Sequence, residues 1–216
     1  MAGSAHRRAL TIDHDLVVLS GGAGRRLGGV PKGDLVLGVR RLLERVIAAD
    51  PSARDVVIVG PTSAAVVRRD GRPEPIWCRE DPPGGGPLAG LAAALPYVTS
   101  PVLLVLAVDL PFAAPAVPEL LAAVDAPGVS AAVLTQLSGH RLALAAAYRR
   151  QPLVDRLGAI GEPSGRPLSL VLDGLDVVQV PDRWGASQDV DTPGDLDRAR
   201  RRADQVDVTR QTGRGR

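Results

Sequence analysis

The sequence has very few aromatic residues, which make up only 2% of its 216 positions. Alanine, valine and leucine must therefore fill most of the core. The single cysteine, Cys78, excludes an internal disulfide and fits a cytoplasmic location. No apolar run reaches the roughly 18 residues of a membrane span, and Met1–Thr11 lacks the apolar segment of a signal peptide. We therefore expect no membrane partner.

Lysine is almost absent as well. All 26 basic residues are arginines except Lys32, which lies in a glycine-rich segment. A lone lysine there suggests a position that requires a compact ammonium rather than a planar guanidinium, although chance placement is the alternative. The net charge is only +2, and few aromatic side chains are available to stack on bases. A nucleic-acid partner is therefore not expected.

Apolar runs of strand length alternate with segments of helical spacing along most of the chain. This alternation predicts an α/β fold, a three-layer αβα sandwich with a mostly parallel sheet. We expect one domain over residues 15–203, between flexible tails at 1–14 and 204–216. Strands are predicted at 15–20, 55–59, 75–78, 102–108, 129–134 and 176–180, helices at 41–49, 62–69, 88–95, 115–124, 149–158 and 193–202, and either structure at 142–147.

A glycine-rich loop, Gly21–Gly33, follows the first predicted strand. It holds six glycines together with Arg25, Arg26 and Lys32. Glycines let backbone N–H groups approach an anion, and the cations add charge, so the loop suits a triphosphate. It is not a P-loop, because Gly33 rather than serine or threonine follows the lysine, and its glycine spacing also misses the dinucleotide-binding motif. The loop predicts a phosphate site of another kind, with a flexible surface loop as the alternative.

Acidic residues stand at the ends of predicted strands and beside glycines. Asp109 follows the most apolar strand, where a carboxylate needs a positive partner such as Mg²⁺, unless it caps a loop or helix. Asp189 and Asp191 face the same way in an extended stretch, so they either complete a metal site or cap the last helix. Asp81 precedes a second glycine loop and fits a hydrogen-bond acceptor for guanine or ribose, or a turn residue.

No set of residues indicates a covalent nucleophile. Cys78 has no basic neighbour in sequence, and His140 lies in an expected turn. Direct phosphoryl-type transfer needs positioning and charge stabilisation rather than a nucleophile. The phosphate loop and the carboxylates agree with that reaction class.

Taken in order, these motifs resemble those of molybdenum cofactor guanylyltransferases. Leu19–Lys32 matches the signature L-A-G-G-x-x-x-R-M-G-G-x-D-K, and the match continues through 80–81, 86–90, 107–112 and 189–193. The resemblance implies a Rossmann-like nucleotide-diphospho-sugar transferase fold. It also implies Mg²⁺-dependent transfer of GMP from GTP onto the phosphate of molybdopterin, the molybdenum cofactor, with release of pyrophosphate. Molybdoenzymes and cofactor-insertion proteins are the further partners that it suggests.

The resemblance also implies roles for individual residues. The catalytic residues would be Arg26, Lys32 and Asp109, and the metal ligands would be Asp109 and Asp189. The residues that bind the nucleotide would be Leu19, Ser20, Gly21, Gly22, Lys32, Asp81, Gly86, Gly90 and Asp109.

The sequence departs from the family pattern at several positions. Leu27 replaces the usual methionine, Gly60 replaces an asparagine that contacts nucleotide in some members, and Val39 and Arg41 replace a glycine and a proline. Pro31 stands where an aspartate precedes the lysine, and a Pro-Lys pair is closer to cytidylyltransferases that act on the same cofactor. The first alternative is therefore a cytidylyltransferase or a sugar-phosphate nucleotidyltransferase. The second is a catalytically weak nucleotide- or cofactor-binding carrier.

Overall fold

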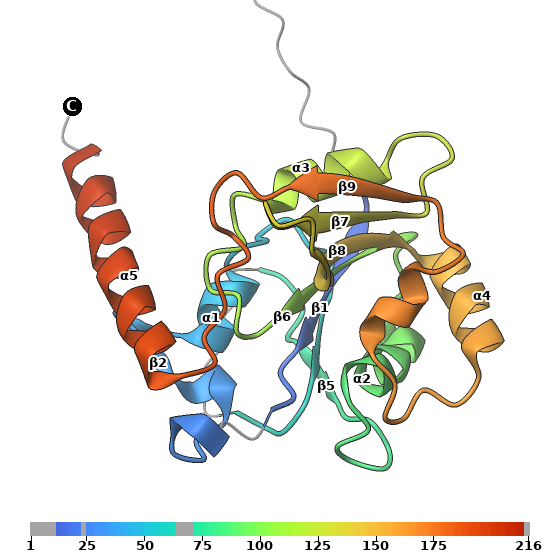
Figure 1. The fold of residues 1–216 in the computed structure, drawn as a ribbon, viewed down its shortest axis with the longest axis horizontal. Helices are drawn as coiled ribbons and strands as arrows, with labels where there is room; N and C mark the ends of the chain where they lie inside the picture. Colours follow the sequence, from blue (N-terminus) through green and yellow to red (C-terminus); the bar gives the residue numbers. More distant parts are fainter. Residues whose placement is uncertain (1–11, 23–24, 64–70, 214–216) are drawn as a thin grey trace, which may run out of the picture.

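A seven-stranded sheet forms the centre of the molecule (Figure 1). The computed structural model describes residues 12–22, 25–63 and 71–213. The strand order is β5-β4-β1-β6-β8-β7-β9, and β8 runs antiparallel to both of its neighbours while the other pairs are parallel. The strands are β1 (His14–Leu19), β4 (Val56–Val59), β5 (Ile76–Cys78), β6 (Val102–Ala107), β7 (Ala131–Thr135), β8 (Arg141–Arg149) and β9 (Val177–Pro181), and β2 (Val36–Leu37) pairs with β3 (Arg40–Arg41) in a separate ribbon.

Helices cover both faces of this sheet, because its central strands are apolar on both sides. Leu16 and Val18 of β1 face one core, and Val17 and Leu19 face the other. The first core is covered by α1 (Leu42–Ile47), α3 (Val117–Val124) and the N-terminal part of α5 (Pro193–Gly213), and the second by α2 (Pro87–Ala94) and α4 (Arg150–Ile160). The predicted three-layer αβα sandwich with a mostly parallel sheet is confirmed.

Small aliphatic side chains fill both cores, as the scarcity of aromatic residues predicts. Ala145, Ala146 and Ala147 of β8 are buried at the centre of the sheet. Tyr148 is fully buried, and its hydroxyl donates a hydrogen bond to the carbonyl of Ala143 at 2.8 Å. That bond satisfies the one polar atom that this aromatic ring brings into the core.

Several strands and helices have other boundaries in the structure than those predicted from the sequence. The ambiguous segment 142–147 is a strand, part of β8, because it pairs with both β6 and β7. His14 begins β1 and so does not belong to an N-terminal tail. The last helix does not end at Arg202 but continues to Gly213, through residues that the sequence assigned to a tail. No proline interrupts this stretch, and glycine commonly ends a helix. The helix predicted over 62–69 lies mostly outside the described residues.

The parallel strands place three loops together at one edge of the sheet. The loops after β1, β4 and β6 all leave the carboxyl ends of neighbouring strands, which is where ligands bind in open α/β sheets. Among the described helices, none is long and apolar enough to cross a membrane.

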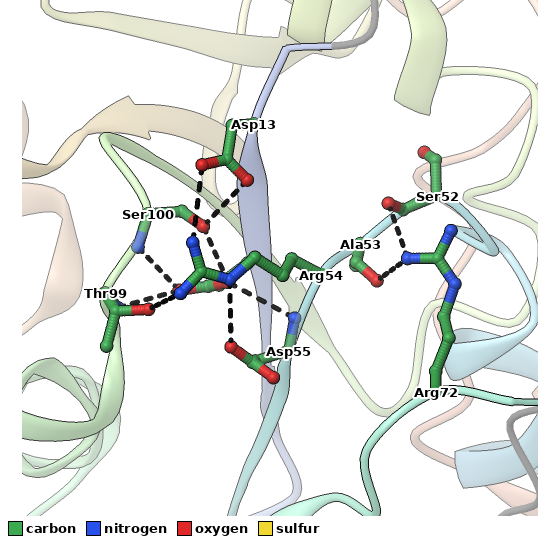
Figure 2. A network of polar contacts seen from close by, with 9 residues as sticks. Asp13, Ser52, Ala53, Arg54, Asp55, Arg72, Thr99 and Ser100 are labelled. Atoms are coloured by element: carbon green, nitrogen blue, oxygen red, sulfur yellow. Dashed lines mark hydrogen bonds and ion pairs between the residues drawn. The ribbon is translucent and has the colours of Figure 1, made fainter.

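The opposite edge of the sheet is held by a network of polar contacts, part of which is buried (Figure 2). The carboxylate of Asp15 accepts hydrogen bonds from the backbone N–H groups of Thr99 and Ser100, at 2.8 and 2.9 Å, and from the Ser100 hydroxyl. Arg54 donates to the Thr99 hydroxyl at 2.7 Å and pairs with Asp13. These contacts join the beginnings of β1, β4 and β6, which is a structural role.

A buried pair, His14 and Asp50, lies nearby. His14 is hydrogen-bonded through Nδ1 to the Ile12 carbonyl and through Nε2 to the Asp50 carboxylate, each at 2.7 Å. Both acceptors lack a proton of their own, so the ring must donate from both nitrogens, which requires the imidazolium form. Burial opposes that charge, but Asp50 outweighs burial and the pKa of His14 is raised.

Candidate active site

A cleft of about 790 Å³ opens at the carboxyl edge of the sheet. Its walls come from the loops after β1, β4 and β6 and from the segment that leads into α2. Its volume is in the range of small-molecule sites. The lining residues are Leu19, Gly21, Gly22, Gly29, Pro31, Val59, Gly60, Pro61, Arg79, Glu80, Gly84, Gly86, Pro87, Gly90, Ala107, Asp109 and Leu144.

The loop after β1 is held tightly against its neighbours. Ser20 is buried, and its N–H donates to the Val59 carbonyl at 2.7 Å. Gly60 has a φ of +146°, and a Cβ at this position would lie 2.8 Å from the carbonyl carbon of Ser20. Gly60 must therefore be glycine for the two strand ends to approach this closely. The structure thus gives Gly60 a packing role that sequence reasoning missed.

Lys32 emerges from a short 3-10 turn, η2 (Lys32–Asp34), directly beside this loop. The buried Gly33 anchors the turn, since a Cβ there would lie 3.0 Å from the Ser20 hydroxyl. The Lys32 side chain runs past Gly22 and is only 15% exposed. Its ammonium lies 2.8 Å from a carboxylate oxygen of Asp109 and also donates to Asp191. The only lysine of the chain therefore bridges two carboxylates that are distant from it in sequence.

The two carboxylates come from different loops, and a backbone hydrogen bond joins these loops. Asp109 follows β6, and the N–H of Val190 donates to the Asp109 carbonyl at 3.1 Å. Burial lowers the pKa of Lys32, but Asp109 and Asp191 more than offset this, so the pKa is raised and the ammonium stays charged. Burial and the nearby Asp191 and Asp109 also raise the pKa of Asp189. Negative charge is thus concentrated around one cation.

The carboxylates around Lys32 offer oxygen ligands of the kind that Mg²⁺ prefers. Within the part of the chain that the structure describes, no three His, Cys, Asp or Glu side chains form a ready-made metal site. However, Asp109 and Asp191 already share one cation, the Lys32 ammonium. Mg²⁺ often takes only one or two carboxylates and completes its shell with substrate phosphates and water. The donor set therefore fits an ion that binds together with a triphosphate. Asp189 as a ligand stays a prediction.

The second glycine loop forms the opposite wall of the cleft. Gly86 precedes α2 with a φ of +89°, a conformation that favours glycine, and Gly90 packs where a Cβ would lie 3.4 Å from Val59. Asp81 is exposed and is not part of the lining, whereas Glu80 is and accepts a hydrogen bond from the Gly84 N–H at 2.9 Å. The neighbouring carboxylate is therefore better placed to contact a ligand than the one that the sequence indicated.

The structure brings most of the predicted site residues together. Arg26 is exposed in the 3-10 turn η1 (Arg25–Leu27) and does not line the cleft, so its catalytic role stays a prediction. Asp191 contacts Lys32 directly, whereas the sequence offered Asp189 and Asp191 only as a pair that either completes a metal site or caps the last helix. Those that line the cleft are Leu19, Gly21, Gly22, Gly86, Gly90 and Asp109, with Ser20 buried beside them and Lys32 in contact with Asp109.

Residues 16–173 match the family model described as the MobA-like NTP transferase domain. This match covers more than half of the chain. The chain belongs to the MobA-like NTP transferase family. The matched residues of this MobA-like domain include the glycine-rich loop, Lys32 and Asp109, but end before Asp191. The contact between Lys32 and Asp191 is therefore an observation of the structure alone.

Relatives of this MobA-like domain agree with that assignment. The molybdenum cofactor guanylyltransferase of Haemophilus influenzae is 33% identical over 104 residues, which cover 48% of this chain and 53% of the relative. The one of Acidiphilium cryptum is 36% identical over 107 residues, which cover 45% and 50%. The chain thus matches only about half the length of these curated relatives.

Solved structures share the fold over a larger part of the chain. Molybdopterin-guanine dinucleotide biosynthesis protein A from Archaeoglobus fulgidus superposes with a TM-score of 0.68 and 27% identity, over 88% of this chain and 99% of that one. The 2-C-methyl-D-erythritol 4-phosphate cytidylyltransferase from Thermus thermophilus superposes with a TM-score of 0.67 and 21% identity, over 89% and 99%. The second likeness shows the fold alone.

Proposed function

We propose that this chain transfers GMP from GTP onto the phosphate of molybdopterin and releases pyrophosphate, with Mg²⁺ as cofactor. The observation that carries the proposal is the contact of Lys32 with Asp109 and Asp191 at the mouth of a glycine-lined cleft. A cation between carboxylates, beside exposed backbone, suits phosphates that arrive with a metal ion. The names of the guanylyltransferase relatives supply the donor and the acceptor.

The nucleotide would lie along the cleft with its phosphates at the first glycine loop. Gly21 and Gly22 are exposed and line the cleft, so backbone can approach an anion there without steric hindrance. Lys32 lies next to Gly22 and would pair with phosphate oxygens. Arg26, which is exposed in the same loop, is a candidate for a further phosphate contact.

The reaction would be a direct displacement. An oxygen of the acceptor phosphate attacks the α-phosphorus of GTP, the bond from that phosphorus to the β-phosphate oxygen breaks, and pyrophosphate leaves with the electron pair. An ionised phosphate acceptor needs no general base, which agrees with the absence of a histidine from the cleft lining as far as the structure describes it. Lys32 would stabilise the negative charge that grows on the leaving pyrophosphate. Mg²⁺, held by Asp109 and Asp191 with Asp189 nearby, would neutralise phosphate charge.

We further propose that Glu80 recognises the base. It is the acidic side chain that lines the cleft near the second glycine loop, and one of its oxygens is used by the Gly84 N–H. A carboxylate has further acceptor capacity, and guanine presents neighbouring N–H donors on its Watson–Crick edge. Glu80→Gln should therefore reduce the preference for GTP over the other nucleotides. Asp81→Asn, made in parallel, tests the prediction from the sequence that Asp81, which is exposed beside the cleft, contacts the nucleotide instead.

Release of pyrophosphate from each of the four NTPs, with and without molybdopterin, tests the proposed reaction. We expect release only with GTP, Mg²⁺ and the acceptor together, and loss of release in Asp109→Asn. The Pro31-Lys32 pair, whose proline lines the cleft, keeps a cytidylyltransferase as the second candidate. Release of pyrophosphate with CTP, and with none of the other three NTPs, would establish that candidate. Binding of nucleotide without any release would indicate a carrier instead.

A further inference from the structure

The loop that leads to Asp189 and Asp191 is organised around one buried carboxylate. Asp182 is 7% exposed and accepts hydrogen bonds from three backbone N–H groups, those of Trp184, Ala186 and Ser187, at 3.1, 2.9 and 2.8 Å. Burial opposes ionisation, but these bonds outweigh it and hold the pKa of Asp182 below its usual value. Residues 182–188, which we call the Trp184 loop, therefore have a defined shape.

Arg202 of α5 fastens this loop to the body of the protein. Its guanidinium donates to the carbonyls of Trp184 and Gly185, each at 2.7 Å, and to the side-chain oxygen of Gln188 at 2.8 Å. Gly185 has a φ of +63°, and a Cβ there would lie 3.3 Å from the guanidinium nitrogen. Both its conformation and this close approach favour glycine. These three acceptor oxygens match the planar array of N–H donors that an arginine guanidinium presents.

The same guanidinium also contacts the loop that carries Asp109. It lies 3.9 Å from the ring centroid of Phe112, the only phenylalanine of the chain, which is buried in the core beneath α5. Phe112 is three positions after Asp109, and Val190 is bonded to the Asp109 carbonyl. Arg202 therefore touches both segments that present carboxylates to Lys32, although it belongs to neither.

We propose that Arg202 is a positioning residue that holds the Asp109 and Asp191 carboxylates at their working separation. Its flat guanidinium stacks on Phe112, in the loop that carries Asp109, and donates hydrogen bonds to the Trp184 loop. It therefore fixes these two segments against each other. This inference rests on the proposed function, since the carboxylate pair matters only if it takes part in the reaction. Arg202 lies outside the residues matched by the family model.

Three variants at two positions of α5 test this role. Arg202→Met keeps an apolar stem but loses the fork, and Arg202→Lys keeps the charge without the planar array. Arg200→Met is the matched control, because Arg200 lies on the same helix and, among the described residues, pairs only with the exposed Asp197, at 3.4 Å. Each variant is made in the full chain in a Trp77→Phe background, which leaves Trp184 as the only tryptophan.

The first readout is the fluorescence of Trp184 and needs no substrate. In Arg202→Met we expect red-shifted emission and stronger quenching by acrylamide, with little recovery in Arg202→Lys and no change in Arg200→Met. Unchanged Trp184 emission in a folded Arg202→Met protein would overturn the inference. Full recovery in Arg202→Lys would also overturn it, because charge rather than the planar fork would then hold the loop.

The second readout is the response to divalent metal. Loss of a residue that orients metal ligands typically lowers metal affinity or activity by about 10- to 100-fold. We therefore expect Arg202→Met to need about 10-fold or more Mg²⁺ for half-maximal pyrophosphate release, with a small change in KM for GTP. Mn²⁺ titration in the presence of a non-hydrolysable GTP analogue should show the same loss without turnover. A perturbed Trp184 with wild-type metal dependence would overturn the positioning role.

These readouts separate this inference from the proposed function. If wild-type protein releases no pyrophosphate from any NTP, the proposed reaction fails, while fluorescence and Mn²⁺ titration still decide the role of Arg202. If wild-type protein is active and Arg202→Met matches it in both readouts, only the inference fails.

Discussion

Replacing Lys32 with alanine removes the cation that joins Asp109 to Asp191, and its effect on turnover follows from the proposed role. In the reaction, the ammonium would stabilise charge on the leaving pyrophosphate. Loss of one preorganised charge stabiliser typically costs about 10²–10³-fold in kcat, and we expect a loss of that size. Lys32→Arg should also lower turnover strongly, because a planar guanidinium is bulkier than an ammonium and demands another geometry of its acceptors.

The effect on stability follows from the burial of the contact. An exposed lysine would contribute little, but Lys32 is 15% exposed and Asp109 is 23% exposed. A hydrogen bond to a charged group contributes about 1.5–3 kcal/mol, and at this chain length each kcal/mol shifts Tm by about 2–4 °C. The contact with Asp191 adds less, because that side chain is 45% exposed. We expect Lys32→Ala to lower Tm by about 3–12 °C in EDTA.

Mg²⁺ should reverse much of this loss. Without Lys32, the carboxylates repel one another, and a divalent cation that binds only the folded state stabilises it by mass action. The assay is a thermal melt of wild type, Lys32→Ala and Arg200→Ala in EDTA and in excess Mg²⁺, alongside steady-state kinetics. Arg200→Ala controls for loss of an exposed cation. An unchanged Tm in EDTA would refute the bridging role, and full activity of Lys32→Arg would refute the requirement for a compact ammonium.

Three further perturbations follow from the same structure. Asp109→Asn keeps the shape of the side chain but removes its charge, so turnover measured at saturating Mg²⁺ should fall by orders of magnitude; near-normal turnover would argue against a metal ligand. Gly60→Ala places a Cβ against the Ser20 backbone, so denaturant titration should show a loss of about 1–3 kcal/mol, and an unchanged midpoint would contradict the tight approach. The His14–Asp50 pair makes stability depend on pH. The folded pKa of His14 lies above its ordinary 6.5, so its contribution is full below pH 6.5 and is lost as the pH rises through the folded pKa. The folded pKa of Asp50 lies below its ordinary 3.8, so its contribution is present above pH 3.8 and is lost as the pH falls through the folded pKa. The Tm advantage of wild type over His14→Gln should therefore shrink from pH 6 to pH 9, and a constant advantage would exclude the imidazolium form.

The sequence alone was sufficient for the architecture. Val102–Ala107 is apolar at every position because β6 is covered on both faces, and such a run is legible without coordinates. The glycines and the single lysine of 21–33 were equally legible, and the structure places Gly21 and Gly22 in the cleft wall with Lys32 beside them. Local composition carries these features, and so local patterns predict them.

Only the tertiary structure shows which residues make up the site. Lys32 lies 77 positions from Asp109 and 159 from Asp191, and no sequence pattern shows that the three meet. The same holds for Glu80, which lines the cleft while its neighbour Asp81 is exposed, because the path of the loop decides which carboxylate faces inward.

The role of α5 in the site was also decided by the tertiary structure alone. The sequence predicted the last helix only as far as residue 202 and assigned 204–216 to a tail, without indicating a role for Arg202. Packing of α5 against the core that contains Phe112 brings Arg202 within reach of two loops. Spacing along a chain indicates strands, helices and turns, because each has its own local pattern of apolar and turn-forming residues. Which distant side chains share a site is set by how those elements pack.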